Sequence, residues 1–279
     1  MRRRAPAGRG SSTPRSFPAG GSARAAERTL DILLAFLREG REMGISELSR
    51  IVRLPKATVH RLVQVLVSRG FLARDPATAG YRVGLTPFRL GNLFLAQTHV
   101  RQVALPVIHE LARRTGETVN LNVVVDRHRI CIEKAESPQD IRHAVELGRP
   151  LPLYAGASGK VLLAHLPEEE IEAVLAAGIH RFTPRTIVDP ARLRRSLAEI
   201  RRRGYAVTSD ERVAGASAVS APIRNGAGRV VAGLTISGPT YRFTPDRVRS
   251  FITLVREGAR QISAALGYGP AGLPRARAR

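Results

Sequence analysis

Residues 44–70 read GISELSRIVRLPKATVHRLVQVLVSRG, and this stretch predicts two short helices joined by a tight turn. Ser46 is a favourable N-cap for the first helix, because its hydroxyl can accept a hydrogen bond from a free backbone N–H. Pro55 suits the first turn of the second helix, where a backbone N–H is not needed. Gly70 follows the last helical residues and is a typical C-terminal cap. The pattern is typical of a helix-turn-helix.

The second helix has one apolar face and one polar face. The apolar residues recur at positions i, i+3, i+4 and i+7, so they are expected to pack on the neighbouring helices; they are Val59, Leu62, Val63 and Leu66. The polar face carries no acid and consists of Lys56, Ala57, Thr58, His60, Arg61 and Gln64. A helix with such a face can enter the major groove of double-stranded DNA by its N-terminal end and contact base edges and phosphates. The alternative is a helical bundle with a solvated polar face, on which His60 contacts nothing.

The flanking residues extend this motif on both sides. Apolar residues at helical spacing predict a preceding helix over residues 24–38. Two β-prone segments, 71–74 and 81–85, follow on either side of a turn that contains Asp, Pro and Gly. Three helices and a hairpin predict a winged helix-turn-helix over residues 24–86. Its further candidate DNA contacts are Ser46 and, on the wing, Arg74 and Arg82.

The net charge of the chain favours a polyanionic partner. Lys and Arg number 45 and Asp and Glu number 23, which gives +22, and nucleic acid is the commonest polyanion that a protein binds. A compositional bias towards Arg accounts for part of this charge, so charge alone does not decide the function. Residues 1–23 and 269–279 are rich in Gly, Pro and Arg and are predicted to be disordered basic arms, either solvated or in contact with DNA phosphates.

Several classes of protein are not favoured by the composition. The single cysteine, Cys131, excludes an intrachain disulfide framework, and its two flanking isoleucines predict a packed apolar thiol. The histidines lack metal-ligand spacing, so no metal and no cofactor is predicted. The chain has neither a run of about 18 apolar residues nor the apolar core of a signal peptide. We expect a soluble cytoplasmic protein that does not contact a membrane.

The rest of the chain predicts an α+β domain over residues 101–268, preceded by a linker helix at 87–100. Hairpins are expected from 118–125 with 129–134 and from 216–224 with 229–237, and a further strand at 141–147. Helices are expected at 102–114, 158–165, 167–176, 190–203 and 245–266, with Asp189 as the N-cap of the fourth and Gly204 just beyond its end. Hairpins with flanking helices predict a largely antiparallel sheet.

Residues 156–160, Gly-Ala-Ser-Gly-Lys, form a loop of small residues at the start of a predicted helix. Exposed backbone N–H groups at such a place suit a carboxylate. A phosphate-binding loop does not fit, because Tyr154 stands where the first glycine of that motif belongs and Val161 replaces its Ser or Thr. Lys160 is expected to be structural and to cap neighbouring carbonyls.

Several motifs occur in a fixed order between about residues 24 and 266. In the first domain they are Ile45-Ser46-Glu47-Leu48-Ser49, Leu54-Pro55-Lys56-Ala57-Thr58-Val59-His60-Arg61-Leu62, Gly70-Phe71-Leu72 and Tyr81-Arg82-Val83-Gly84. In the second they are Ala157-Ser158-Gly159-Lys160-Val161-Leu162-Leu163-Ala164, Arg203-Gly204-Tyr205, Asp210-Glu211 with Gly215, and Ile236-Ser237-Gly238-Pro239. In this combination the chain resembles the IclR family of bacterial regulators. The resemblance implies a winged helix-turn-helix, a linker helix and a GAF/profilin-like effector domain.

The resemblance also implies partners and a second site. Members form homodimers, often paired into homotetramers, on palindromic operators, and they repress or activate catabolic genes in response to a small-molecule effector, an organic acid or an aromatic metabolite. We expect a carboxylate here. By family position, the effector pocket is lined by Ala157, Ser158, Thr208, Ala218, Thr235 and Ser237. Thr208 departs from the many members with an acid at this position, and Ala218 stands where some have Cys. Without the resemblance, Thr235 and Ser237 are equally well explained as ordinary strand residues.

Three other functions stay open on the sequence alone. A metabolic enzyme is the first, although Ser158 and Lys160 form no complete nucleophile–base set with a histidine. The second is a nonspecific basic DNA-binding protein, and the third is a sensor that acts only through other proteins. A sequence-specific regulator should prefer its operator over random DNA by about 10³-fold or more at physiological salt, whereas a nonspecific binder should not.

Overall fold

The structure is a computed structural model that describes residues 22–269, except for the side chains of residue 22 and residues 95–97. The chain forms two compact units, one that ends at Phe94 and one that begins at Leu95. Of the two predicted basic arms, residues 1–21 and 270–279 lie outside the described residues. Residues 22 and 23, predicted to be disordered, belong to the first helix instead.

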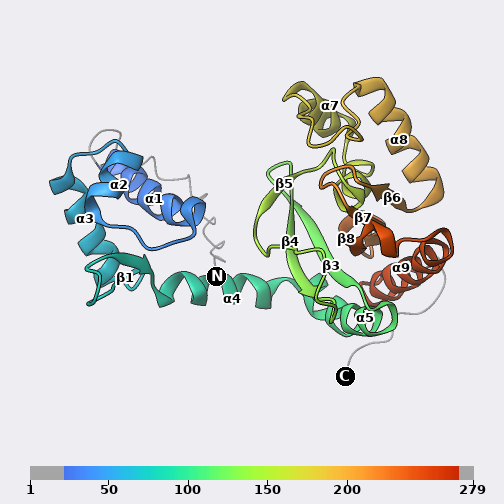
Figure 1. Ribbon diagram of the computed structural model, residues 1–279, viewed down its shortest axis with the longest axis horizontal. Coiled ribbons are helices and arrows are strands. Elements are labelled where there is room, and N and C mark those ends of the chain that lie inside the picture. The colour runs from blue at the N-terminus through green and yellow to red at the C-terminus, as the bar shows by residue number, and fades with distance from the viewer. Residues whose placement is uncertain (1–21, 270–279) are drawn as a thin grey trace, which may run out of the picture. The chain divides into compact units, whose positions relative to one another are not determined.

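The first unit is a winged helix-turn-helix, as predicted (Figure 1). Its elements are α1 (Ser22–Glu39), α2 (Ile45–Ile51), α3 (Lys56–Ser68), the antiparallel strands β1 (Leu72–Arg74) and β2 (Tyr81–Val83), and the start of α4 (Leu85–Gln97), which continues into the second unit. The expected linker helix thus begins two residues earlier, and ends three residues earlier, than predicted. Gly70 adopts a φ of 71°, which suits the glycine predicted to end α3.

The prediction that Ser46 caps α2 is wrong. The N-cap is Gly44, whose carbonyl accepts a hydrogen bond of 3.0 Å from the Leu48 N–H, and no side chain caps this end. The helix therefore starts at Ile45, which packs against the core of this unit, and Ser46 lies exposed within its first turn. The burial of Ile45 and Leu48 on one face sets the start of the helix more strongly than the capping preference of a serine hydroxyl.

One hydrophobic core holds the first unit together. The predicted apolar face of α3 supplies Val59, Val63 and Leu66, which are buried, and Leu62, which packs against them at the edge. These side chains meet Ile32 and Phe36 of α1, Leu48 of α2, and Met43, Leu72 and Tyr81. Met43 also forms a β-bridge with Tyr81, so the wing is bonded to the segment between α1 and α2.

The second unit is an antiparallel sheet with helices on both faces, which confirms the predicted α+β class. Its helices are α5 (His99–Thr115), α6 (Ala157–Leu163), α7 (Glu168–Ala176), α8 (Pro190–Arg203), the 3-10 helix η1 (Thr240–Arg242) and α9 (Pro245–Ala265). Its strands are β3 (Thr118–Val125), β4 (His128–Ala135), β5 (Pro150–Pro152), β6 (Ala206–Ser209), β7 (Ala216–Arg224) and β8 (Val230–Pro239). They pair in the order β5-β4-β3-β8-β7-β6.

Most of these elements match the sequence predictions within a few residues. The hairpins β3–β4 and β7–β8 form as expected. Helix α8 has the predicted bounds, because the Asp189 side chain accepts the Arg192 N–H and Gly204 adopts a φ of 75° beyond the last turn. The short edge strands β5 and β6 were not predicted, since three or four residues give too little alternation to detect.

The predicted strand at 141–147 is wrong. These residues lie in the loop between β4 and β5, residues 136–149, which we call the pocket loop. Its backbone carbonyls accept hydrogen bonds from side chains instead of strand N–H groups: Lys134 Nζ lies 2.6 Å from the Val145 oxygen, and Arg242 Nη1 lies 2.9 Å from the Ile141 oxygen. The apolar-polar alternation of this segment resembles that of a strand, but these distant partners hold it in another conformation.

The two faces of the sheet carry two separate cores, and Figure 1 shows α5 and α9 on one side of the sheet. Helices α5 and α9 cover one face and bury residues such as Ile108, Leu121, Leu234 and Val255. Gly258 lies at this contact, where a Cβ would come within 2.9 Å of Leu111 Cδ1 and neighbouring side chains would have to shift. Helices α6, α7 and α8 form the second core on the other side of the sheet. The pocket described below opens on this second side.

Candidate functional site

The polar face of α3 is exposed, as the sequence predicted for a surface that contacts a ligand. Lys56, Ala57, His60, Arg61 and Gln64 are exposed, and Thr58 is half-buried. Helix α3 contains no Asp or Glu, so no acid of this helix offsets the charges of Lys56 and Arg61. Because the first turn presents small and cationic side chains, the backbone of this end can approach the edge of a DNA duplex closely.

The wing lies beside α3 and is connected to it by a side-chain contact. Tyr81 of β2 is buried, and its hydroxyl accepts a hydrogen bond of 3.3 Å from Gln64 Nε2. Part of the hydrogen-bonding capacity of Gln64 is thus already used within the unit. Arg74 and Arg82 project from the two strands and are exposed. The nine residues predicted to contact DNA all lie at the surface of the first unit, with Ser46 on α2.

The second unit contains a pocket that collects all six residues predicted to line an effector site. Ala157 and Ser158 come from α6, Thr208 from β6, Ala218 from β7, and Thr235 and Ser237 from β8. The pocket has a volume of about 70 Å³. His143, Glu146 and Arg149 of the pocket loop complete its wall. Residues far apart in the sequence therefore converge on one small polar cavity.

The alternation of side chains along the strands explains this convergence. Successive residues of a strand point to opposite faces of the sheet. On β8, Leu234 and Ile236 point into the core beneath α5 and α9, whereas Thr235 and Ser237 line the pocket. On β3, Val119 and Leu121 point into that core, whereas Asn120 lines the pocket. Thr235 and Ser237 are thus strand residues whose side chains line the pocket.

The small-residue segment 156–160 has a different local structure from the one expected, because α6 already begins at Ala157. The Ala157 N–H, expected to be free for a carboxylate, donates a hydrogen bond of 3.0 Å to Thr208 Oγ1. Thr208 therefore satisfies a backbone donor of the loop. Gly159 is required by packing, because a Cβ there would lie 2.6 Å from the Leu153 carbonyl oxygen. The small side chains allow α6 to pack closely on the end of the preceding segment.

Lys160 is structural, but its partner is not the one predicted. Instead of capping carbonyls, Lys160 Nζ forms an ion pair of 2.8 Å with Glu211 Oε2, and the two side chains are 6% and 5% exposed. The other carboxylate oxygen of Glu211 is buried and has no hydrogen-bond partner among the described residues. Glu211 lines the pocket, so this pair connects α6 to the pocket wall.

A chain of buried hydrogen bonds crosses the sheet beside the pocket. Arg129 Nη1 donates to Asn122 Oδ1 at 3.0 Å, and Asn122 Nδ2 donates to Asn120 Oδ1 at 2.7 Å. Asn120 Nδ2 then donates to Ser237 Oγ at 3.2 Å, and the ring Nδ1 of His143 lies 3.2 Å from the same oxygen. Since Ser237 Oγ accepts from Asn120, its own proton is free for His143 Nδ1. This chain connects β4, β3 and β8 to the pocket loop.

The ionisable groups of the pocket are mainly basic. Burial, and after it the nearby positive charges of Arg212 and Arg129, lower the pKa of His143 to about 4, so the ring is neutral at physiological pH. Burial also lowers the pKa of Arg129, to about 10, where the guanidinium is still protonated. The pocket therefore presents positive charge and hydrogen-bond donors to a ligand.

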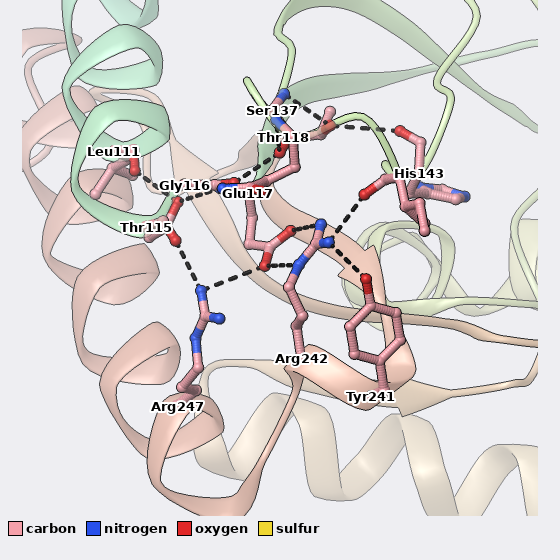
Figure 2. Close-up of polar contacts among 12 residues, drawn as sticks. Leu111, Thr115, Gly116, Glu117, Thr118, Ser137, His143, Tyr241, Arg242 and Arg247 are labelled. Carbon is pink, nitrogen blue, oxygen red and sulfur yellow. Dashed lines mark hydrogen bonds and ion pairs between the residues drawn. The ribbon is translucent and has the colours of Figure 1, made fainter.

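A buried ion pair anchors the base of the pocket loop (Figure 2). Arg242 of η1 bonds both carboxylate oxygens of Glu117 and also donates to the Ile141 carbonyl of the loop. Thr118 Oγ1 donates to the His143 carbonyl at 3.4 Å and accepts the Ser137 N–H at 3.2 Å. The loop is thus held at several points by residues next to the start of β3.

The sequence did not reveal every residue of this pocket. Asn120, Arg129, His143 and Arg212 line it but were not predicted. One signal was available: Asn120 and Asn122 are polar residues at alternate positions of an otherwise apolar strand, which indicates a polar partner on that face. Arg129 and Arg212 are 83 positions apart in sequence, and no spacing argument connects them.

Two family models match almost the whole described chain. The model of the IclR helix-turn-helix domain matches residues 25–76, and the model of the bacterial transcriptional regulator IclR C-terminal domain matches residues 93–264. The chain belongs to the IclR family. The predicted resemblance is thereby confirmed, and the two matches fall on the two units of the structure.

Members of the IclR family with a described function are similar over most of their length. The HTH-type transcriptional repressor AllR of Klebsiella pneumoniae is 37% identical over 249 residues, which is 89% of this chain and 92% of that protein. AllR of Escherichia coli K12 is 37% identical over 246 residues, 88% and 91% of the two chains. The chain is therefore a DNA-binding transcription regulator of the IclR type, and the alternative of a metabolic enzyme is set aside.

Solved IclR structures have the same fold. The IclR regulator of Alicyclobacillus acidocaldarius matches with a TM-score of 0.78 and 30% identity, covering 88% of this chain and 99% of that one. An IclR homologue from Microbacterium hydrocarbonoxydans, complexed with 4-hydroxybenzoate, matches with a TM-score of 0.77 and 30% identity, covering 87% and 98%. The predicted order of domains, a helix-turn-helix followed by an effector domain, is confirmed.

Two kinds of feature are absent from the described residues. Within residues 22–269, no group of three His, Cys, Asp or Glu side chains is arranged to hold a metal ion. In the same part of the chain, no helix combines the length and apolarity that crossing a bilayer requires.

Proposed function

We propose that this IclR-type regulator binds a palindromic operator as a homodimer or homotetramer and responds to a small carboxylate in the pocket of its second unit. One observation supports the proposed effector site. The six predicted residues, which come from four elements, line the same cavity together with several basic side chains. A carboxylate matches the hydroxyl and guanidinium donors of this cavity. The solved relative with 4-hydroxybenzoate, which also carries a carboxylate, supports this class of ligand.

We assign DNA reading to the front of α3. We assign Thr58, Arg61 and Gln64 to base edges or phosphates, Ala57 to close approach, and Lys56 and His60 to phosphates; apart from the half-buried Thr58, all of these residues of α3 are exposed. Arg74 and Arg82 of the wing, and Ser46 of α2, are assigned to the DNA backbone or minor groove. The exposure of this set and the absence of acids from α3 support the assignment.

Exposed apolar side chains of the first unit support self-association. Leu30, Leu34 and Leu37 of α1 are at least half exposed, and so are Leu85, Phe88 and Phe94 of α4. Several large apolar side chains exposed on the same helix are unusual on a monomer and favour an interaction site. A two-fold symmetric dimer would cover these side chains and present two α3 helices to a palindromic site.

The named relatives are repressors, and we propose that this chain represses catabolic genes until its effector binds.

The test of DNA reading measures the affinity of the full-length protein, of Thr58→Ala and of Arg61→Ala for a fluorescent duplex from the promoter of its own gene. Each lost base contact should weaken binding by about 1–3 kcal/mol while the melting temperature is kept. Arg113→Ala, at an exposed cation of α5, is the matched control.

Two outcomes would contradict this assignment. Unchanged affinity in both α3 variants would mean that another surface reads the DNA. An operator preference well below about 10³-fold over shuffled duplex at physiological salt would favour the nonspecific binder instead.

A second experiment tests the effector site. Ser237→Ala should change the acid concentration that releases the operator and leave DNA binding in the absence of the acid unaltered. Identical release curves would remove Ser237 from the site.

A further inference from the structure

We propose that the effector is a compact dianion and that Arg129 and Arg212 together hold its second negative charge. This proposal rests on the proposed effector function and adds the charge and size of the ligand. Neither arginine belongs to the set that the family resemblance implied. Both line the same pocket, Arg129 from β4 and Arg212 from the loop that follows β6.

The charges of the pocket do not balance without a ligand. Apart from Arg129 and Arg212, the charged side chains at the pocket form two ion pairs. Arg149 pairs with Glu146 at 2.6 Å, and Glu211 pairs with Lys160, which lies behind the wall, at 2.8 Å. Among the residues that the structure describes, no carboxylate lies within 4.0 Å of the guanidinium of Arg129 or Arg212. Two positive charges are therefore left without a partner at one cavity.

Arg129 is the stronger indication, because it is buried. Its exposed fraction is 5%, and its Nε has no hydrogen-bond partner among the described residues. Among the described residues, the one hydrogen bond of its side chain goes to the neutral amide of Asn122. Buried arginines are normally paired with an anion, since an uncompensated buried charge is costly. An arginine left in this state beside a cavity points to an anion supplied by the ligand.

The positive charge of Arg212 also acts on Arg129. Burial is the main cause that lowers the pKa of Arg129, and the positive charge of Arg212 is the second. The pKa of Arg212 is lowered by its own burial and then by Arg149. Both guanidinium groups are charged at physiological pH, so the positive charge of Arg212 acts as a repulsion on the more buried Arg129, whereas Glu146 offsets part of the charge around Arg212. A dianion removes this repulsion, whereas a monoanion compensates only one of the two charges.

The size of the pocket limits the ligand. Its volume is about 70 Å³, whereas an enclosed protein cavity that holds benzene measures about 150 Å³. A dianion with a backbone of two or three carbons suits this space, and an aromatic acid requires the pocket loop to move. Two negative charges on so small a molecule come either from two carboxylates or from one phosphate group, and the test below separates these sources.

The experiment measures ligand binding to the full-length protein by calorimetry in a buffer without other polyvalent anions. The dianions oxalate and malonate are compared with glycolate and lactate, monoanions of two and three carbons. We expect the dissociation constant of each dianion to be at least tenfold lower than that of its monoanion. Inorganic phosphate forms a separate arm, which distinguishes a phosphate ligand from a dicarboxylate.

The variants Arg129→Gln and Arg212→Gln should reduce the dianion preference to about threefold or less and leave monoanion binding within about threefold of the original. Arg127→Gln is the matched control: it removes an exposed arginine of the β3–β4 turn that does not line the pocket, and it should keep the full preference. Arg212→Gln, at the less buried of the two sites, keeps the test valid if Arg129→Gln folds poorly. Melting temperatures identify a folding defect.

The outcomes separate this inference from the proposed function. If monoanions bind and release the operator as well as dianions do, the proposed effector function stands and this inference is wrong. The inference is also wrong if both arginine variants retain the tenfold preference. If neither class of acid binds at millimolar concentration, the carboxylate effector is wrong; if inorganic phosphate does not bind either, the dianion is wrong as well.

Discussion

Arg242 donates two hydrogen bonds of 2.7 Å to the carboxylate of Glu117, from Nε to Oε1 and from Nη2 to Oε2 (Figure 2). The carboxylate is almost fully buried, and Arg247 Nη2 adds a third contact at 3.3 Å. Paired bonds of this geometry fix both position and orientation. Because Arg242 also bonds the Ile141 carbonyl, the pair fixes the pocket loop relative to the start of β3.

The first prediction concerns this ion pair. Glu117→Gln should lower the free energy of unfolding by about 3 kcal/mol, since it leaves Arg242 without its buried counter-charge. Urea denaturation of the full-length protein measures the change. Glu110→Gln is the control: Glu110 pairs with Arg113 on the exposed side of α5 and should contribute little. Equal midpoints for the two variants would show that the buried pair adds no stability.

The second prediction concerns Lys160 and Glu211. Lys160→Met should destabilise the protein by about 3 kcal/mol, because it leaves the Glu211 carboxylate buried without a cation. The double variant Lys160→Met with Glu211→Leu should recover a large part of this loss, since apolar side chains of similar volume replace buried ion pairs well. A double variant that is no more stable than Lys160→Met would indicate that Glu211 is needed for packing or for the loop itself.

The third prediction concerns pH. The folded protein keeps His143 neutral, with a pKa of about 4, whereas the unfolded chain protonates it near the ordinary value of 6.5. The unfolded state therefore binds the extra proton, and the free energy of unfolding should fall as the pH drops from 6.5 towards 4 and stay level above 6.5. His165, whose pKa burial also lowers, acts in the same direction.

Urea midpoints at pH 7, 6 and 5 measure this dependence. The loss attributable to His143 approaches about 3 kcal/mol at the acid end of the window. His143→Gln should show a shallower fall between pH 7 and 5 than the unmodified protein. Parallel curves for the two proteins would mean that His143 is protonated as readily in the folded state as in the unfolded chain.

The fourth prediction concerns Cys131. Its side chain is 3% exposed, and burial raises the pKa of the thiol to about 11. The reactive thiolate is thus nearly absent at pH 8. A thiol reagent such as Ellman's should label the folded protein over hours and label it at once in concentrated guanidinium. Rapid stoichiometric labelling of the folded protein would contradict the packed position of this thiol.

The sequence predicted the elements that depend on local periodicity. The apolar positions of α3, from Val59 to Leu66, follow directly from a helix that packs on one side, and Asp189 and Gly204 bound α8 by their local backbone preferences. The family motifs located Thr208, Thr235 and Ser237, and these residues do line one pocket. Such features can be predicted from residues that are close in sequence or from motifs shared with a known family.

The remaining features depend on partners that are distant in sequence. Lys160 and Glu211 are 51 positions apart, and the sequence around Lys160 favoured carbonyl caps instead. Residues 141–147 alternate like a strand, but Arg242, Thr118 and Lys134 hold their carbonyls in a loop. Ser46 has the chemistry of a helix cap, yet the packing of Ile45 moves the start of the helix.

The way the pocket loop is held has a consequence for how the protein can diverge. No ladder of strand hydrogen bonds runs through residues 136–149; side chains from outside the loop hold its backbone oxygens. Substitutions or insertions there leave the pairing of β3, β8 and β7 in register. Selection for a new metabolite can therefore act on this stretch without placing the folding of the regulator at risk.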